Sequence, residues 1–372
     1  MIPLCLLAES VVVLYKIRKP HELSHLLSCG GGDTAGTVAR EHVAIFSFRD
    51  SLSDTGNLCV DGIPDYLATA RLPYGMTYFG YRTGASPMAA SSSTSSELGR
   101  PLLPPSKTKN ATFHRGANFA ITGATALDLS FFQERGLDKG MWRSGSLHTQ
   151  IKCSAQACRE LSRRSLFIVG EFGGNDYGST LFAFRPLSKV HALVLHVVAS
   201  IGRGVEALIR RARVIKHGAK TVVVSGIPPL GCSPPNLAMF PSADPAGYDP
   251  RTGCLKQLND LSVYHNSLLQ EAIGDVETKR RNVRVICADF FTPIMQIVES
   301  PEKLGLTRDI LRVCCGGGGK YNFNISAGCG MPGSTVCRDP SAYLYWDGHF
   351  TEAAYRYIAG GWLNTINNCK HY

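Results

Sequence analysis

Three residue types that together perform nucleophilic catalysis occur in two short stretches at opposite ends of the chain. Ser51 follows the apolar run 43–48, while Asp347 and His349 lie within the stretch 345–356. A serine hydroxyl becomes a nucleophile when a histidine takes its proton and an aspartate orients that histidine. The two stretches therefore predict Ser51 as nucleophile, His349 as general base and Asp347 as the residue that orients the base.

The position of Ser51 supports this interpretation. The run Val43 to Phe48 is rich in β-formers and stops abruptly, which predicts a buried strand followed by a turn. A serine just past such a strand lies at the carboxyl edge of the sheet, where open α/β sheets bind their ligands. Taken alone, a Ser-Asp-rich stretch after a strand is more often only a turn.

Two further stretches carry groups that could stabilise a developing negative charge. The segment Arg164 to Val169 predicts a strand, and Asn175 follows it with a side-chain N–H that could donate to an oxyanion. Gly123 follows the segment 117–121. By residue type alone, Asn175 fits a turn equally well, and a lone glycine predicts a tight turn.

Four stretches in this order resemble the plant-type GDSL esterase/lipase family of SGNH hydrolases: 50–57, 116–123, 170–177 and 345–356. The resemblance runs from about residue 43 to the C-terminus. It implies a three-layer α/β/α, flavodoxin-like SGNH hydrolase fold with a central parallel sheet. It also implies a serine esterase or lipase without metal or organic cofactor, acting on small-molecule, cell-wall or lipid esters. The implied oxyanion hole consists of the N–H groups of Ser51 and Gly123 and the side chain of Asn175.

The rest of the pattern favours a doubly wound α/β fold, because strand and helix signals alternate. Strands are predicted at 221–224 and 283–288, and helices at 189–213, around 258–273 and at 351–366. The helix at 189–213 has nine apolar residues on one face at the helical period: Val190, Leu193, Val194, Val197, Val198, Ile201, Val205, Leu208 and Ile209. For the last helix we expect a narrow packing face of Ala354, Tyr357, Gly361 and Thr365.

The expected organisation is a leader and linker over residues 1–42, followed by a single hydrolase domain over 43–372. The leader is interpreted as a degraded signal peptide, because Glu9 interrupts its apolar part and its basic residues follow that part. The low-complexity run Ala85 to Ser96 has no apolar period. It is read either as a local shift of reading frame or as a genuine flexible insertion.

Composition limits the partners and the compartment. The formal net charge is +10, and the basic residues are scattered without interleaved aromatic residues, so we expect no nucleic acid partner. A basic surface of this kind suits acidic wall polysaccharides or anionic lipid. Thirteen cysteines indicate an oxidising compartment, with Cys314, Cys315, Cys329 and Cys337 as loop staples. Acceptor sequons at Asn110 and Asn324 agree with a secreted glycoprotein. No segment of the body is expected to be able to span a membrane, so no stable membrane insertion is expected, and the oligomeric state is left open.

Three departures from the family pattern predict a weakened site, one of them being the helix-forming material missing from the run 85–96 and near Lys152. Arg49 replaces a glycine; at positive φ it would cost about 1–2 kcal/mol, and its side chain could block the cleft. Only Gly348 separates Asp347 from His349, where the family has two residues. We expect this missing residue to displace the imidazole by up to about 3.5 Å. The alternatives to an esterase are therefore an impaired relative that binds glycans or lipids, and a defective gene product.

Overall fold

The central element of the fold is a five-stranded parallel sheet. The computed structural model describes residues 42, 44–63, 72–74, 102–138, 145–153, 165–214, 221–307 and 309–368. The strands are β1 (Ala44–Phe48), β2 (Gly116–Asn118), β3 (Ser165–Val169), β4 (Thr221–Ser225) and β5 (Arg284–Ala288), in the order β2-β1-β3-β4-β5. This is the flavodoxin-like order of a doubly wound sheet, and it confirms the predicted fold class.

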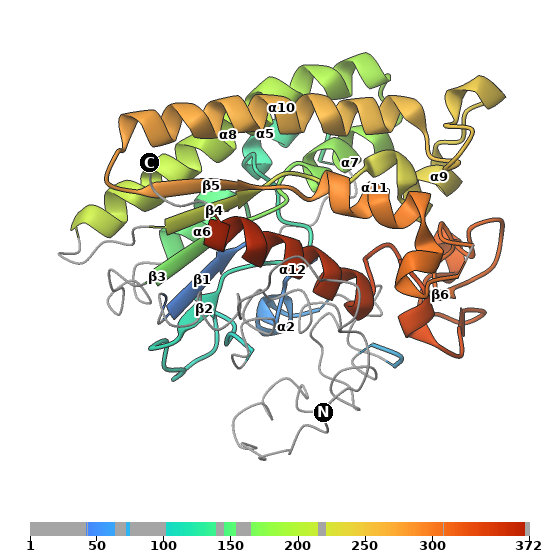
Figure 1. The fold of residues 1–372 in the computed structure, drawn as a ribbon, viewed down its shortest axis with the longest axis horizontal. Helices are drawn as coiled ribbons and strands as arrows, with labels where there is room; N and C mark the ends of the chain where they lie inside the picture. The colour runs from blue at the N-terminus through green and yellow to red at the C-terminus, as the bar shows by residue number, and fades with distance from the viewer. Residues whose placement is uncertain are drawn as a thin grey trace.

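Helices cover both faces of the sheet, which makes three layers (Figure 1). On one side lie α5 (Leu129–Gln133), α6 (Leu147–Cys153), α7 (Gly174–Phe182), α8 (Leu187–Val214) and α10 (Lys256–Lys279). On the other side lie α11 (Phe291–Glu299) and α12 (Glu352–Asn368). Shorter elements in the described part of the chain include α2 (Asn57–Asp61), α9 (Pro234–Met239) and the antiparallel pair β6 (Cys315–Gly316) and β7 (Thr335–Val336), besides several single-turn 3-10 helices.

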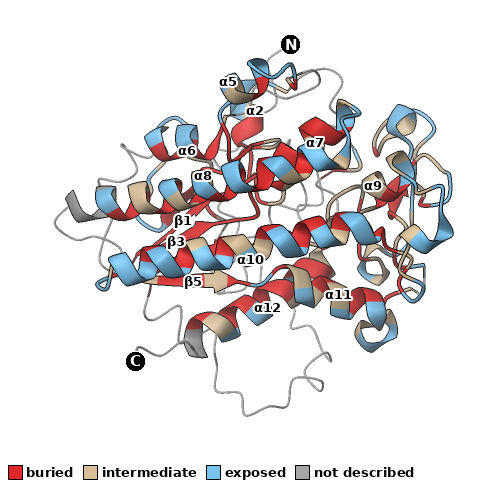
Figure 2. Cartoon of the chain, turned by 90° about the horizontal axis from the view of Figure 1, so that it is seen from above, coloured by how far each residue is buried: buried red, intermediate tan, exposed pale blue. Residues whose placement is uncertain are grey.

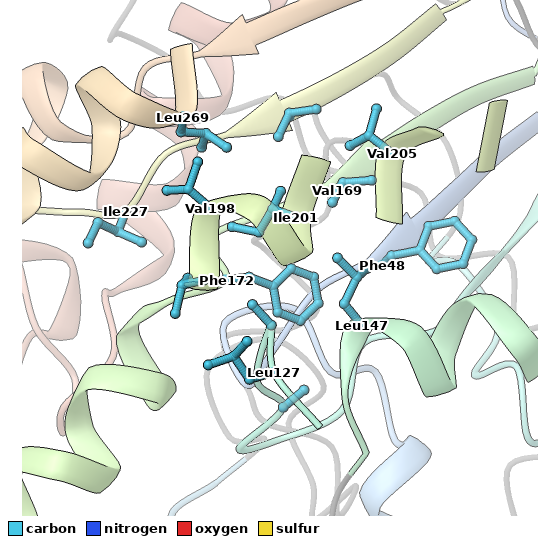
Figure 3. Packing of buried hydrophobic residues seen from close by; sticks show 14 of the residues in the cluster. Phe48, Leu127, Leu147, Val169, Phe172, Val198, Ile201, Val205, Ile227 and Leu269 are labelled. Carbon is cyan, nitrogen blue, oxygen red and sulfur yellow. The ribbon is translucent and has the colours of Figure 1, made fainter. Parts of the chain in front are cut away.

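The strands are apolar on both faces because each face packs against a helical layer. Along β1, Phe46 and Phe48 belong to the core shared with α8 and α10, whereas Ile45 belongs to the core shared with α11 and α12. Figure 3 shows part of the first core, where side chains of α8 such as Val198 and Ile201 lie beside residues of the strands and of α6. Two cores therefore hold the sheet in place from its two sides.

Helix α8 matches the prediction for 189–213 and extends slightly beyond it. All nine predicted apolar residues are buried. Figure 2 shows how buried and exposed residues alternate along α8 and α10. The segment Leu187–Arg210 is also apolar and long enough to cross a membrane by length and composition, so the expectation that no segment of the body could do so is wrong. Its buried stripe packs against the sheet and α10, as in a core helix of a globular enzyme.

The predicted packing face of α12 is wrong in register. Gly361 is exposed, and Tyr357 and Thr365 are partly exposed. Of the predicted face Ala354 is buried, and the other buried residues are Tyr355, Ile358, Ala359, Trp362, Leu363 and Ile366. Burial of the large Trp362 determines the register, because its indole N–H donates to the carbonyl of Asp289 at 2.7 Å just beyond β5.

Some sequence-based expectations fall outside the described residues. These are residues 1–41 of the leader and the low-complexity run 85–96.

The strands β1, β3, β4 and β5 begin and end within one residue of their predicted bounds.

Candidate active site

The topology of the sheet brings three of the predicted site residues to one edge. Ser51 follows β1, Gly123 lies in the loop after β2, and Asn175 lies in the first turn of α7 directly after β3. These strands are neighbours in the order β2-β1-β3, and parallel strands all end on the same side. The gap between β1 and β3 is the switch point at which flavodoxin-like sheets bind ligands.

The turn before α12 completes the group. His349 Nε2 lies 3.0 Å from Ser51 Oγ, although the two residues are 298 positions apart. His349 Nδ1 lies 2.8 Å from Asp347 Oδ1. A continuous chain of hydrogen bonds thus joins Asp347, His349 and Ser51, in the geometry of a nucleophile, a base and an orienting carboxylate.

The short spacing between Asp347 and His349 does not displace the imidazole, so that expectation is wrong. The two residues lie in a tight turn in which Tyr345 pairs with Phe350 and the Trp346 N–H donates to the His349 carbonyl at 2.8 Å. Inside the turn, Asp347 Oδ1 also accepts the backbone N–H of His349 at 2.8 Å. The carboxylate therefore shapes the turn with the same oxygen that contacts the imidazole.

A disulfide-linked segment supports this turn from behind. Cys314 N–H donates to the carbonyl of Tyr345 at 2.9 Å, and Cys315 N–H donates to the carbonyl of Trp346 at 2.6 Å. Each of these cysteines is itself in a disulfide: Cys314 with Cys337, and Cys315 with Cys329. The four cysteines predicted as loop staples thus fix the segment on which the turn of Asp347 and His349 rests. A third disulfide joins Cys232 to Cys254, and among the described cysteines Cys287 is a free thiol.

The charges of the turn favour a basic imidazole. Burial lowers the pKa of His349, but the charge and hydrogen bond of Asp347 outweigh burial and raise that pKa above its ordinary value. Burial would raise the pKa of Asp347, yet its contacts with His349 and Tyr74 hold the pKa well below the usual range. Asp347 is therefore ionised across the neutral range and can stabilise an imidazolium.

Arg49 does not block the cleft, so that expectation is also wrong. Its side chain is 2% exposed and forms an ion pair with Glu171, with Nε 2.6 Å from Oε2. Its φ is not among the positive values, which occur at Asn110, Glu171, Phe184 and Asn322 and at glycines. The side chain of Gln150 binds the Arg49 backbone on both sides, accepting from its N–H at 3.1 Å and donating to its carbonyl at 2.8 Å.

Asn175 lies between the loops that follow β1 and β2. Its amide nitrogen donates to the carbonyl of Ala124 at 2.9 Å and to Asp50 Oδ2 at 3.2 Å. Burial and the neighbouring Glu171 raise the pKa of Asp50 well above its ordinary value. Gly173, with φ of 129°, begins the turn into α7 in a conformation that favours glycine, and this turn places Asn175 at the sheet edge.

Sequence reasoning missed two carboxylates that hold the loop after β2. Asp54 accepts the N–H of Thr122 at 2.9 Å and that of Asn57 at 2.7 Å, which ties the nucleophile loop to the loop of Gly123. Asp176 accepts the N–H groups of Ala126 and Leu127 at 2.9 and 3.0 Å. Burial raises the pKa of Asp176 to about 6. The sequence signal for these two residues was an aspartate shortly after an apolar strand. Such an aspartate indicates a loop anchor, because an ionised carboxylate can accept several backbone N–H groups.

Other candidate sites are few in the described part of the chain. No three His, Cys, Asp or Glu side chains gather there in a way that could hold a metal ion. A cavity of about 220 Å³ lies behind the turn, lined by Asp339, Pro340, Ser341, Trp346, Thr351, Glu352, Ala353 and Arg356. Ser51 and His349 do not line this cavity, so it is not assigned to the reacting part of a substrate.

A doubly wound α/β sheet with a Ser-His-Asp chain at its carboxyl edge has the architecture of a serine hydrolase. The family model described as GDSL-like Lipase/Acylhydrolase matches residues 45–362. A GDSL esterase/lipase from Arabidopsis thaliana is 39% identical over 343 residues, covering 87% of this chain and 91% of the relative. Sinapine esterase from Brassica napus is 36% identical over 341 residues, covering 87% and 86%. The chain belongs to the GDSL lipase/acylhydrolase family, whose members hydrolyse ester bonds.

Proposed function

We propose that this chain is a secreted serine esterase that hydrolyses carboxylic esters through Ser51, His349 and Asp347. The observation that carries the proposal is the hydrogen-bond chain from Asp347 Oδ1 through His349 to Ser51 Oγ, with contacts of 2.8 and 3.0 Å. Family membership supplies the reaction type, and this chain of contacts supports the residues that perform it.

The reaction proceeds in two halves. Ser51 Oγ attacks the carbonyl carbon of the ester while His349 Nε2 takes the hydroxyl proton, and the resulting imidazolium is stabilised by Asp347. The tetrahedral intermediate collapses when the C–O bond to the alcohol breaks and His349 returns its proton to the leaving oxygen. Water then attacks the acyl-serine with His349 as base, which releases the acid and restores the Ser51 hydroxyl.

The negative oxygen of each tetrahedral intermediate is bound by the N–H groups of Ser51 and Gly123 and the side chain of Asn175. All three groups follow the carboxyl ends of neighbouring strands, which supports their convergence on one oxygen. Both amide hydrogens of Asn175 are engaged, with Ala124 O and Asp50 Oδ2, so the longer contact, that with Asp50, is the one that the amide gives up to bind the oxyanion. Gly123 has φ of 75°, a conformation that favours glycine and sets the direction of the peptide around it. Preorganised donors of this kind supply a large share of the barrier reduction.

Extracellular localisation is supported by oxidised cysteines and exposed sequons. Three disulfides are formed between described cysteines, as expected in an oxidising compartment. Asn110 and Asn324, the two sequon asparagines, are both exposed and thus accessible to glycosylation.

The family match over residues 45–362 supports the single domain expected for 43–372. Since one relative is named sinapine esterase, sinapine is a first substrate to test, beside acetyl esters.

A fluorophosphonate probe tests the proposal. We expect the folded wild-type chain to be labelled and to hydrolyse a model ester, and the Ser51→Ala variant to lose both. Ser53→Ala, two residues further along the same loop, is the matched control and should keep labelling. A well-folded wild-type chain that is neither labelled nor active would overturn the esterase proposal and favour a glycan- or lipid-binding relative.

A further inference from the structure

Tyr74 makes a contact with Asp347 that the reaction scheme above does not use. Its ring is 7% exposed, and its hydroxyl lies 2.6 Å from Asp347 Oδ2. The two residues are 273 positions apart, so the contact is tertiary. Because the pKa of Asp347 is held low, the carboxylate is ionised and the tyrosine O–H is the donor.

The two oxygens of Asp347 are held from different directions. Oδ1 accepts from the backbone of Gly348 and from the backbone and Nδ1 of His349, all within the same turn. Oδ2 accepts from Tyr74, which comes from a separate segment of the chain. Within the described part of the chain, no other hydrogen-bond donor reaches Oδ2. Tyr74 therefore adds a restraint on the carboxyl group from outside the turn, on the oxygen that the turn itself does not hold.

We propose, on the basis of the esterase function above, that Tyr74 is a positioning residue of the reaction. Through Asp347 it keeps the His349 ring aligned with Ser51 Oγ. Tyr74 acts through Asp347 rather than on the substrate, so its loss should lower the rate of the chemical step more than substrate binding.

The same contact also adjusts the basicity of His349. The Tyr74 O–H draws electron density from the Asp347 carboxylate, which weakens the attraction between that carboxylate and an imidazolium. Without the hydroxyl, the carboxylate would stabilise the imidazolium more strongly, and the pKa of His349 would rise. The other ionisable groups that act on this turn are Asp50, whose charge raises the pKa of His349, and Tyr355, which interacts with Asp347.

The test is Tyr74→Phe in the full chain, measured as kcat and KM for a model ester across pH. Misplacement of a catalytic group by about 1 Å costs on the order of a hundredfold, so we expect kcat to fall by about 10- to 100-fold with little change in KM. The acid limb of kcat/KM should move to higher pH. The control is Tyr357→Phe, which removes an exposed hydroxyl bonded to Gln296 and should leave both parameters unchanged.

A double-mutant cycle with Asp347→Asn separates positioning from a purely structural role. If Tyr74 acts through Asp347, Tyr74→Phe should have almost no further effect on kcat in the Asp347→Asn background. An equal fall in both backgrounds, or an unchanged kcat and pH profile in the single variant, would overturn the inference. If the wild-type chain has no activity that depends on Ser51, the esterase proposal fails. If that activity is present and Tyr74→Phe leaves it unchanged, only the inference about Tyr74 fails.

Discussion

Arg49 and Glu171 form a fully buried ion pair directly beneath the nucleophile loop. Arg49 Nε lies 2.6 Å from Glu171 Oε2, and the Arg49 guanidinium also lies over the Trp362 ring at 5.2 Å from its centroid. The pair links the end of β1, the end of β3 and helix α12, three elements that carry or adjoin the proposed triad. A residue that appeared to obstruct the cleft is instead part of the support below it.

Removal of the arginine alone should destabilise the fold. Arg49→Met leaves the Glu171 carboxylate buried without its cationic partner and beside the buried carboxyl group of Asp50. We expect a loss of about 3–5 kcal/mol in the free energy of unfolding, measured by urea denaturation. The double variant Arg49→Met/Glu171→Met should recover most of this loss, because no charge is then left unpaired.

A surface ion pair provides the comparison for Arg49. Arg251 and Glu299 are in contact at 2.9 Å, but their side chains are 75% and 39% exposed. Arg251→Met should change the free energy of unfolding by less than about 1 kcal/mol. If Arg49→Met proves as mild as this control, the buried pair does not contribute to stability in the way described.

Activity should depend on pH through His349. The imidazole must be neutral to accept the Ser51 proton, so kcat/KM should be constant at high pH and fall as pH drops through the raised pKa of His349. In Asp347→Asn the raising charge is lost while burial still lowers the pKa, so the acid limb should move to lower pH. The kcat should also fall by about 10⁴-fold. An acid limb that stays in place would argue against Asp347 as the partner of His349.

Asn175 should act mainly on the transition state. Asn175→Ala removes the proposed oxyanion donor, which typically costs about 3 kcal/mol of barrier, or roughly a hundredfold in kcat, with KM nearly unchanged. The control Asn236→Ala removes another amide that donates to a backbone carbonyl, that of Leu230, and should retain kcat. Because Asn175 also binds Ala124, thermal unfolding of both variants should be compared; an unchanged kcat in stable Asn175→Ala protein would exclude it from the oxyanion hole.

Two disulfides of matched loop length allow a test of the support behind the turn. Cys314–Cys337 and Cys232–Cys254 span 23 and 22 residues, so their removal should cost similar unfolding free energy, about 3 kcal/mol each. Only the first is in a segment hydrogen-bonded to the turn of Asp347 and His349. We therefore expect Cys314→Ser/Cys337→Ser to lower kcat more than Cys232→Ser/Cys254→Ser. Equal kcat values in the two double variants would contradict this role.

Much of the fold was predictable because its signals are local. The strands at 44–48, 165–169, 221–225 and 284–288 are short apolar runs, and helix α8 has a clear apolar period. Helix α12 was placed correctly, but its buried face was not. Its many small and aromatic residues allow more than one apolar stripe, and packing of Trp362 against the end of β5 selected one of them.

The sequence by itself determined the alternation of strands and helices, the polar residues that follow particular strands, and the family. Only the tertiary structure decided whether those residues meet, because hydrogen-bond distances across 298 positions depend on how the sheet edge and the turn before α12 are packed together. It also decided the orientation of Arg49, since a long side chain can point toward solvent or inward, and the buried carboxylate of Glu171, just after β3, made the inward direction favourable. The contact of Tyr74 with Asp347 likewise arises from packing between distant segments and has no local signature in the chain.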